Sequence, residues 1–154
     1  MAAAHKILED FYEDAFVLVA LHSSLEDYAI AYTLNSSLKS NLKRTKTDLD
    51  ITAKVSFPVF EWRDIINDRY WTLLNNNCIE EATTAQSGLF EQEPSYTNHY
   101  LVPELKDVDY FLKIEQDEEN FQEGIVKTLL SLPNVVTAYA VDANTLKSKK
   151  NLIF

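Results

Sequence analysis

The chain has 154 residues, of which 46% are hydrophobic and 12% aromatic, and its 14 basic and 24 acidic residues give a formal net charge of −10. This length and apolar content predict a single folded domain over residues 1–154 and exclude a disordered polymer. The negative charge disfavours binding to DNA and to anionic membranes. No apolar run approaches the roughly 20 residues that cross a bilayer. The start of the chain is acidic after Lys6, unlike a signal peptide, so we expect a cytoplasmic protein.

The first predicted elements are a strand and a helix. Residues 15–21 (AFVLVAL) form a continuous apolar run, which predicts a strand buried on both faces near the centre of a sheet. A helix is expected to begin at Ser23 or Ser24, whose hydroxyls can accept hydrogen bonds from the first free amides, and to end near Asn41. The expected apolar stripe of this helix comprises Leu25, Tyr28, Ala29, Tyr32, Leu34 and Leu38.

The middle of the chain predicts a hairpin and then a loop. Residues 55–62 contain Pro58, so we expect an edge strand or a strand with a bulge at the proline. Asn67 and Asp68 predict the turn to a second strand at residues 70–74, which the asparagines at 75–77 end. Residues 80–98 show no periodicity, and we expect a long surface loop there.

The last part of the chain predicts a strand, a helix and a strand. Residues 108–115 alternate as a half-buried strand does, apart from Phe111. Asp117 is the expected N-cap of a helix with apolar residues from Phe121 to Leu132, which Pro133 ends. A strand is expected at residues 135–141, and the apolar end at residues 152–154 is expected to dock on the body.

These elements predict an α+β fold in which two helices cover one face of an antiparallel or mixed sheet. A ferredoxin-like arrangement is the nearest architecture. The unit from residue 111 to 142 also resembles the second half of ACT domains in its apolar pattern. Fold analogy of this kind implies little about function.

A more specific resemblance lies at residues 102–110. The segment VPELKDVDY is similar to the motif that names the IPExxxVDY family, a set of small bacterial proteins of unknown function, and it departs from that motif only by Val102 in place of Ile. The resemblance extends to the strand and helix at residues 16–35, to FPVFEW and WTLLNN in the middle, and to NLIF at the end. It implies no activity, cofactor or catalytic residue. We expect Pro103, Glu104 and Tyr110 to have structural roles, with Tyr110 buried and Glu104 hydrogen-bonded.

The residues that could carry chemistry are few. His22, His99, Glu104 and Asp109 could form a small catalytic or metal site, although their spacing matches no known zinc or calcium pattern. Cys78 is followed by acids that raise a thiol pKa, so we expect it to be structural. Only Gly88 and Gly124 occur, which excludes the glycine-rich nucleotide motifs. We therefore expect no bound cofactor and no metal.

The preferred hypothesis is a non-enzymatic binding or adaptor module with an unknown protein partner. Tyr96, Tyr100 and Tyr110 near Glu104 are the candidate binding residues, with core packing as the alternative role for the tyrosines. A small enzyme or metal protein is the second hypothesis. An RNA-associated role of the basic stretch from Lys39 to Lys46 is the third, and the net charge argues against it. We also expect a homodimer, because two helices would leave one face of the sheet uncovered.

Overall fold

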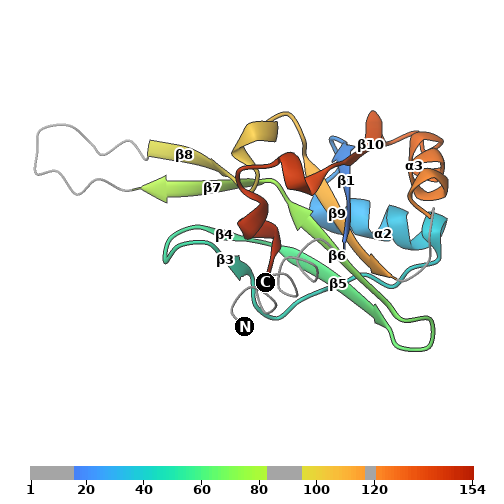
Figure 1. Ribbon diagram of the computed structural model, residues 1–154. Coiled ribbons are helices and arrows are strands. Elements are labelled where there is room, and N and C mark those ends of the chain that lie inside the picture. The colour runs from blue at the N-terminus through green and yellow to red at the C-terminus, as the bar shows by residue number, and fades with distance from the viewer. Residues whose placement is uncertain (1–15, 83–94, 117–120) are drawn as a thin grey trace, which may run out of the picture.

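The computed structural model describes residues 16–82, 95–116 and 121–154. Its main sheet has six strands, all paired antiparallel, in the order β10-β1-β9-β6-β5-β2 (Figure 1). The predicted α+β class with an antiparallel sheet is therefore confirmed. The strands are β1 (Val17–His22), β2 (Lys43–Arg44), β5 (Val59–Asp64), β6 (Arg69–Asn75), β9 (Tyr110–Gln116) and β10 (Thr137–Val141).

Two hairpins and two described helices complete the fold. β3 (Leu49–Asp50) pairs with β4 (Ser56–Phe57), and β7 (Asn77–Ala82) pairs with β8 (Ser95–Tyr100). The helices are α2 (Asp27–Leu38) and α3 (Gln122–Leu130), and three short 3-10 helices are η1 (Pro103–Leu105), η2 (Ala143–Thr145) and η3 (Lys149–Leu152). Neither described α-helix has the length and apolar character that a membrane span requires.

The sheet separates two hydrophobic cores. Because side chains alternate along a strand, β1 sends Val19 and Leu21 into one core and Leu18 and Ala20 into the other. The helix-side core also contains Ile30 and Leu34 of α2 and Ile125 and Leu129 of α3. The opposite core is closed by Phe57, Leu101, Val102, Val108 and Leu152. The prediction that β1 is buried on both faces is confirmed.

Strand β9 differs from its prediction as a half-buried strand. It lies between β1 and β6, so neighbours flank it on both sides and a core lies over each face. Phe111, which broke the expected alternation, is fully buried in the opposite core. Lys113, expected on a solvent-facing side, is only 4% exposed.

Helix α2 is shorter than predicted and turned about its axis. It begins at Asp27, because the Ser23 hydroxyl accepts a hydrogen bond from the Leu25 amide and donates one to the Asn134 carbonyl, which fixes a loop rather than a helix cap. It ends at Leu38, since Lys39 adopts a left-handed conformation with φ 55°.

The predicted apolar stripe of α2 was wrong for two of its residues. Tyr28 and Tyr32 are 65% and 74% exposed, whereas Ile30, Ala31 and Leu34 are buried. The aliphatic side chains occupy the core, and the tyrosines, four residues apart, share the solvent face of the helix.

Pro58 divides the predicted strand at residues 55–62 into β4 and β5. Proline has no N–H group for a sheet ladder, and at this residue the chain passes from the β3–β4 hairpin into the main sheet. The predicted β5–β6 hairpin is confirmed, with Asp68 in a left-handed conformation (φ 52°) at its turn. Trp62 and Trp71 lie opposite each other and their rings meet edge to face, with centroids 5.1 Å apart.

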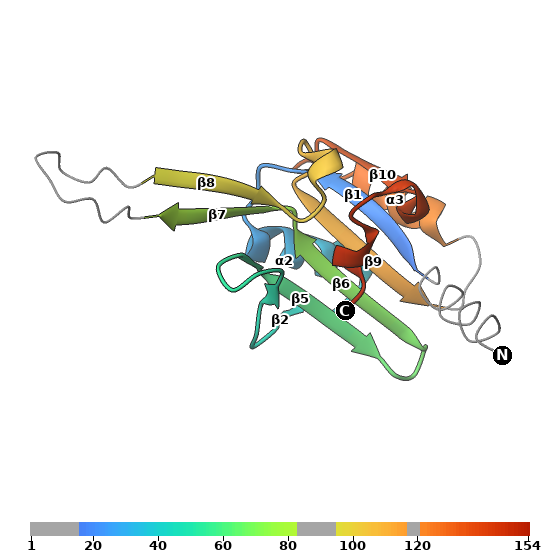
Figure 2. The ribbon, with the colours of Figure 1, turned by 60° about the vertical axis from the view of Figure 1, so that its left-hand side comes forward.

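The expected loop at residues 80–98 was wrong at both ends. Residues 77–82 and 95–100 pair as the β7–β8 hairpin, which we call the arm because it projects from the body of the molecule (Figures 1 and 2). Its residues are polar and irregular in pattern, and pairing along the ladder rather than burial holds them extended. Gly88, at the centre of the expected loop, and Asp117, the expected cap of α3, lie outside the described residues.

The C-terminal elements largely follow the sequence. Helix α3 ends before Pro133, as expected, although Leu130 of the expected stripe is half exposed. Strand β10 pairs with β1 from Thr137 to Val141. The expected docking of the last residues is confirmed for Leu152, which is fully buried in the opposite core.

Asn76 joins the arm to the body. It is fully buried between β6 and β7, and its side-chain amide donates to the carbonyls of Leu105 and Val108 at 2.8 Å each. Its side-chain oxygen accepts from the Val102 amide at 2.9 Å. The backbone of Asn76 also bonds to Asp109 and Leu101. Because these bonds satisfy otherwise buried backbone groups, Asn76 determines the path of residues 101–109.

We predict that Asn76→Ala lowers the free energy of unfolding by more than about 2 kcal/mol, because it leaves the buried Val102 amide and Val108 carbonyl without partners. Urea denaturation measures the change. Asn77→Ala, one residue along and exposed, is the control and should remain within about 0.5 kcal/mol of wild type. A loss below about 1 kcal/mol for Asn76→Ala would show that water replaces the side chain.

Candidate functional site

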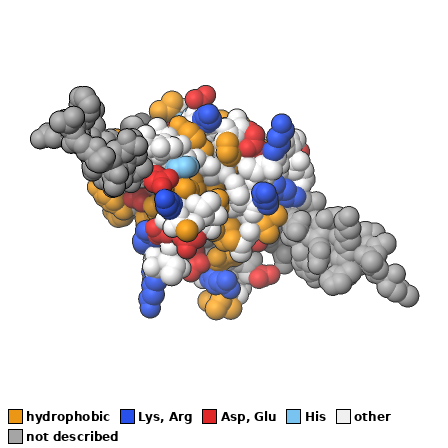
Figure 3. Space-filling view, turned by 90° about the vertical axis from the view of Figure 1, so that its left-hand side faces the viewer, with side chains coloured by type: hydrophobic (Ala, Val, Ile, Leu, Met, Phe, Trp, Pro, Cys, Tyr) orange, Lys and Arg blue, Asp and Glu red, His pale blue; other side chains and the backbone are white. Residues whose placement is uncertain are grey.

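The root of the arm carries a hollow with a largely apolar lining. A pocket of about 690 Å³ lies between the arm, η1 and the loop that connects β3 to β4. Pockets of this size accommodate peptide side chains or small molecules. Figure 3 shows this side of the molecule, on which apolar side chains lie among side chains of both charges. The lining residues are Ile51, Thr52, Ala53, Lys54, Val55, Phe57, Glu80, Asn98, His99, Tyr100, Pro103 and Lys106.

An ionisable pair lies on one face of the arm. Cys78 and His99 are directly opposite in the ladder, and Glu80 follows two residues after Cys78 on the same face. His99 Nε2 lies 2.8 Å from Glu80 Oε2, and both side chains are partly buried. Cys78 is a free thiol that packs against the opposite core. Glu80 and His99 thus satisfy each other, and the pair borders the pocket without an unpaired charge.

The other face of the arm carries exposed apolar and aromatic side chains among polar ones. Ile79 is 62% exposed and Tyr96 65% exposed, and Tyr100 follows on the same face nearer the body. The Lys106 ammonium lies 5.7 Å from the centre of the Tyr100 ring, within the range of a cation–π contact. Tyr96 and Tyr100, two of the predicted binding residues, therefore lie together along the arm.

The other two predicted binding residues lie elsewhere. Glu104 accepts hydrogen bonds from the Ser148 amide at 3.1 Å and the Ser148 hydroxyl at 2.7 Å. Burial alone would raise the pKa of Glu104, but the bonds from Ser148 outweigh this effect and hold its pKa below the usual range. Tyr110 is buried in the helix-side core and donates to the Leu25 carbonyl. Both placements agree with the structural roles expected for the VPELKDVDY segment.

The residues of the alternative catalytic or metal site are not brought together. His22 Nε2 lies 3.0 Å from the Tyr139 hydroxyl, His99 is bound to Glu80, and Glu104 to Ser148. Asp109 accepts from the Ser23 amide at 2.8 Å. Within residues 16–82, 95–116 and 121–154, no three His, Cys, Asp or Glu side chains are grouped as metal ligands would be.

Sequence reasoning missed three residues that the structure makes prominent. Asn76 was grouped with its neighbours as the end of a strand, Glu80 was placed in a loop, and Lys113 was placed on a solvent face. Only Lys113 gave a usable signal, because a lysine in the apolar run YFLKIE is unusual for a central strand.

Comparison of the chain with protein-family models, with curated proteins and with solved structures finds no match. Any function must therefore be argued from the geometry described above.

The Tyr110 hydroxyl generates a prediction about stability and pH. Burial raises the pKa of Tyr110 to about 12, and the carboxylates of Asp27, Asp109 and Glu26 add to the effect. The unfolded chain loses this proton near pH 10, whereas the folded chain keeps it. The contribution of the group to stability is therefore complete below about pH 10 and is lost as the pH rises toward 12.

We predict that Tyr110→Phe destabilises the protein by about 1 kcal/mol at pH 7, because the bond to Leu25 is lost. The stability of the variant should also decline less steeply than that of wild type between pH 9.5 and about 11.5. Urea denaturation across this range measures both effects, with the exposed Tyr32→Phe as the control. Parallel pH curves for wild type and Tyr110→Phe would contradict the prediction.

Proposed function

We propose that this protein is a non-enzymatic binding module that holds a segment of a partner protein at the root of the arm. The observation that carries the proposal is the apolar pocket of about 690 Å³ between the arm and the β3–β4 loop. Ile51, Val55 and Phe57 form one wall, and Tyr100 and Pro103 form the other. Apolar surface of this kind, bordered by polar groups, is typical of a binding site.

The charges at the pocket indicate the character of the partner. Lys54 and Lys106 border the pocket, and the only described carboxylate in its lining, Glu80, is bound to His99. The pocket therefore presents positive charge around an apolar surface. The complementary ligand is an apolar peptide segment that carries Asp or Glu. Ile79 and Tyr96 are exposed farther out on the arm, on the face that carries Tyr100.

A catalytic or metal function receives less support. His22, His99, Glu104 and Asp109 each have a separate partner, and nucleophile, base and oxyanion donors are not placed within reach of one another there. The basic stretch from Lys39 to Lys46 remains the feature on which an RNA-associated role would depend.

We propose membership of the IPExxxVDY family, on the strength of residues 102–110, and a cytoplasmic location. We further propose a ferredoxin-like sheet with both helices over one face, because the strand order β10-β1-β9-β6 has the connections of that fold and β5 extends it.

The binding proposal predicts the outcome of a peptide selection. A displayed library of random peptides, selected on the full chain, should yield sequences with two or more large apolar residues and at least one acid. By fluorescence anisotropy, Lys106→Glu should bind a selected peptide at least tenfold more weakly than wild type, because the charge complementarity reverses. Lys127→Glu on α3 is the matched control and should bind as wild type does.

Two outcomes would contradict this proposal. The first is a consensus without acidic residues. The second is an equal loss of affinity in Lys106→Glu and Lys127→Glu, which would show that only net charge matters. A natural partner captured from cells should likewise be released by Lys106→Glu and retained by Lys127→Glu.

We still predict a homodimer, but through the outer edge of β10 rather than through an uncovered face of the sheet. The expected bare face of the sheet is covered by the opposite core, so it offers no dimer surface. Strand β10 pairs only with β1 among the described strands, and its other edge is available for a second copy. Light scattering at micromolar concentration should give twice 17.7 kDa, and a mass near 17.7 kDa would contradict the dimer.

A further inference from the structure

Lys113 lies at an unusual position for a lysine. It is in the middle of β9, with Leu18 of β1 on one side and Thr72 of β6 on the other, and it is 4% exposed. Its ammonium nitrogen lies 4.8 Å from the centre of the Phe16 ring and 4.5 Å from that of Phe154. No described group accepts a hydrogen bond from it. A buried ammonium normally requires acceptors for its three donors.

A second polar group without a partner lies beside it. Thr72 is directly opposite Lys113 in the β6–β9 register, so both side chains leave the same face of the sheet. The Thr72 hydroxyl is fully buried and makes no hydrogen bond. The hydroxyl of the neighbouring Tyr70 donates a hydrogen bond to the Glu61 carboxylate at 2.9 Å. Burial raises the pKa of Tyr70 and its hydrogen bond to Glu61 adds to this, while the nearby Thr72 hydroxyl, which does not reach hydrogen-bond geometry, has the opposite effect.

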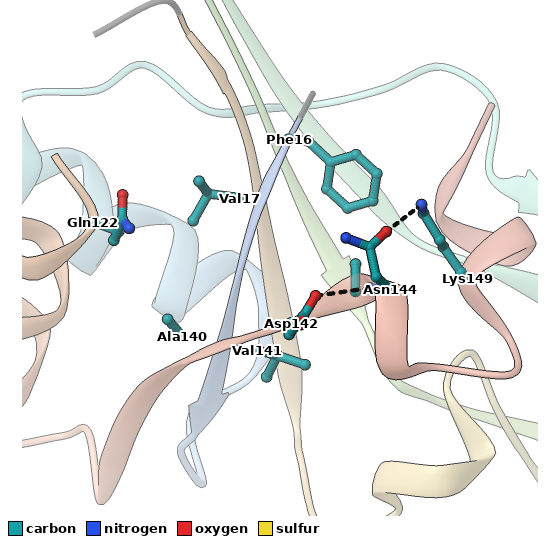
Figure 4. A pocket seen from close by; sticks show the side chains of 9 residues that line it. Phe16, Val17, Gln122, Ala140, Val141, Asp142, Asn144 and Lys149 are labelled. Carbon is teal, nitrogen blue, oxygen red and sulfur yellow. Dashed lines mark hydrogen bonds between the residues drawn. The ribbon is translucent and has the colours of Figure 1, made fainter. Parts of the chain in front are cut away.

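Hollows flank the two aromatic rings that cover Lys113. Phe154 borders a pocket of about 580 Å³ whose other walls include Val59, Tyr70 and the loop at residues 44–49. Phe16 borders a smaller pocket of about 360 Å³ (Figure 4). In the smaller pocket the polar groups bond to one another. The Lys149 ammonium donates to the side-chain oxygen of Asn144 at 2.7 Å, and the backbone amide of Asn144 donates to the Asp142 carboxylate at 3.0 Å. The larger pocket is therefore the natural extension of a site at Lys113.

We propose that Lys113 and Thr72 form the polar end of a binding site for a small carboxylate with an apolar tail, and that Phe154 moves aside to admit it. Phe154 is about half exposed, so its displacement removes little buried area. The ligand tail then occupies the pocket beside Val59, and its carboxylate replaces the Phe154 ring at the ammonium.

The donor set accounts for the choice of a carboxylate. Lys113 offers only donors, and the Thr72 hydroxyl can donate, so an acceptor-only group satisfies both at once. A phosphate monoester carries about −1.5 to −2 charge at pH 7, whereas the single ammonium of Lys113 matches the one negative charge of a carboxylate. The Leu18, Phe16 and Phe154 side chains around the ammonium are apolar. In the larger pocket, Leu49, Val59 and the Tyr70 ring offer apolar surface to a hydrocarbon tail, beside polar residues that include Glu61.

The protonation of Lys113 supports the same site. Burial lowers the pKa of the Lys113 ammonium, and Glu115 on the same strand opposes this effect in part. A carboxylate bound beside the ammonium favours its charged form. Ligand binding should therefore raise the pKa of Lys113.

Octanoate is the probe for this proposal. Titration calorimetry with the full chain should show binding of octanoate to wild type, and binding of octan-1-ol at least tenfold weaker. Lys113→Met keeps the length of the side chain and removes the donors, so it should bind octanoate at least tenfold more weakly. Thr72→Val should weaken binding about threefold, and Phe154→Ala should strengthen it at least threefold. Lys150→Met, an exposed lysine of η3, should bind as wild type does.

A spectroscopic measurement separates direct contact from a change in packing. The ¹³Cε resonance of Lys113, followed against pH by NMR, should report a higher pKa when octanoate is present. Thermal unfolding confirms that each variant is folded before its binding is measured. The proposal is overturned if neither wild type nor Phe154→Ala binds octanoate. It is equally overturned if Lys113→Met binds it as tightly as wild type, or if the pKa of Lys113 does not change. Lys106→Glu should leave octanoate binding unaltered, which distinguishes this site from the one at the root of the arm.

Discussion

The hydrogen bonds of one buried amide, Asn76, fix the place beside the opposite core where the main sheet, the arm and residues 101–109 meet. The bend at Asn76 ends a central strand and begins the arm, so the chain there must leave the sheet without exposing its backbone groups to an apolar interior. The side chain satisfies three backbone groups of residues 102–108, and the backbone satisfies two more at Leu101 and Asp109. A hydrophobic side chain of similar size would leave the Val102 amide and the Val108 carbonyl unpaired, whereas the Leu105 carbonyl would keep its bond from the Val108 amide.

The segment that Asn76 holds, VPELKDVDY, is in turn a junction for other parts of the chain. Glu104 holds the C-terminal segment through Ser148, Asp109 holds the start of the first loop through Ser23, and Tyr110 holds the beginning of α2 through Leu25. Glu104, Asp109 and Tyr110 of this motif therefore connect distant segments through hydrogen bonds to their backbone. Pro103 and Lys106 of the same motif line the pocket at the root of the arm.

The two proposed sites differ in the physical reason for their existence. The pocket at the arm arises because a two-stranded hairpin leaves the body and exposes apolar side chains that no layer covers. The site at Lys113 arises from the opposite circumstance, a polar group inside a covered layer that lacks an acceptor. The first suits a large partner that adds a covering surface. The second suits a small molecule that supplies one missing group.

Local patterns in the sequence were enough to determine most of the elements. The run AFVLVAL, the turn at Asn67 and Asp68, and the stop at Pro133 depend on hydrophobic periodicity and turn chemistry, which act over a few residues. The α+β class and the antiparallel hairpin followed from their order. The face that α2 turns toward the core did not follow from the sequence pattern. Tyrosine fits either the core or the surface, and competition with the aliphatic residues of the helix decides which it occupies.

The tertiary structure alone decided the features that bear on function. The arm has no hydrophobic pattern that would predict its strands, because the pairing of residues 77–82 with 95–100 holds them extended. Asn76 anchors the arm through a hydrogen bond to Val102, a residue distant from it in the chain. Burial of Lys113 depends on Phe16 and Phe154, which come from nearly opposite ends of the described chain. His22, His99, Glu104 and Asp109 lie apart because each faces a different neighbour. Which distant groups meet is decided by the register and layering of the strands, and single-chain periodicity carries no information about that.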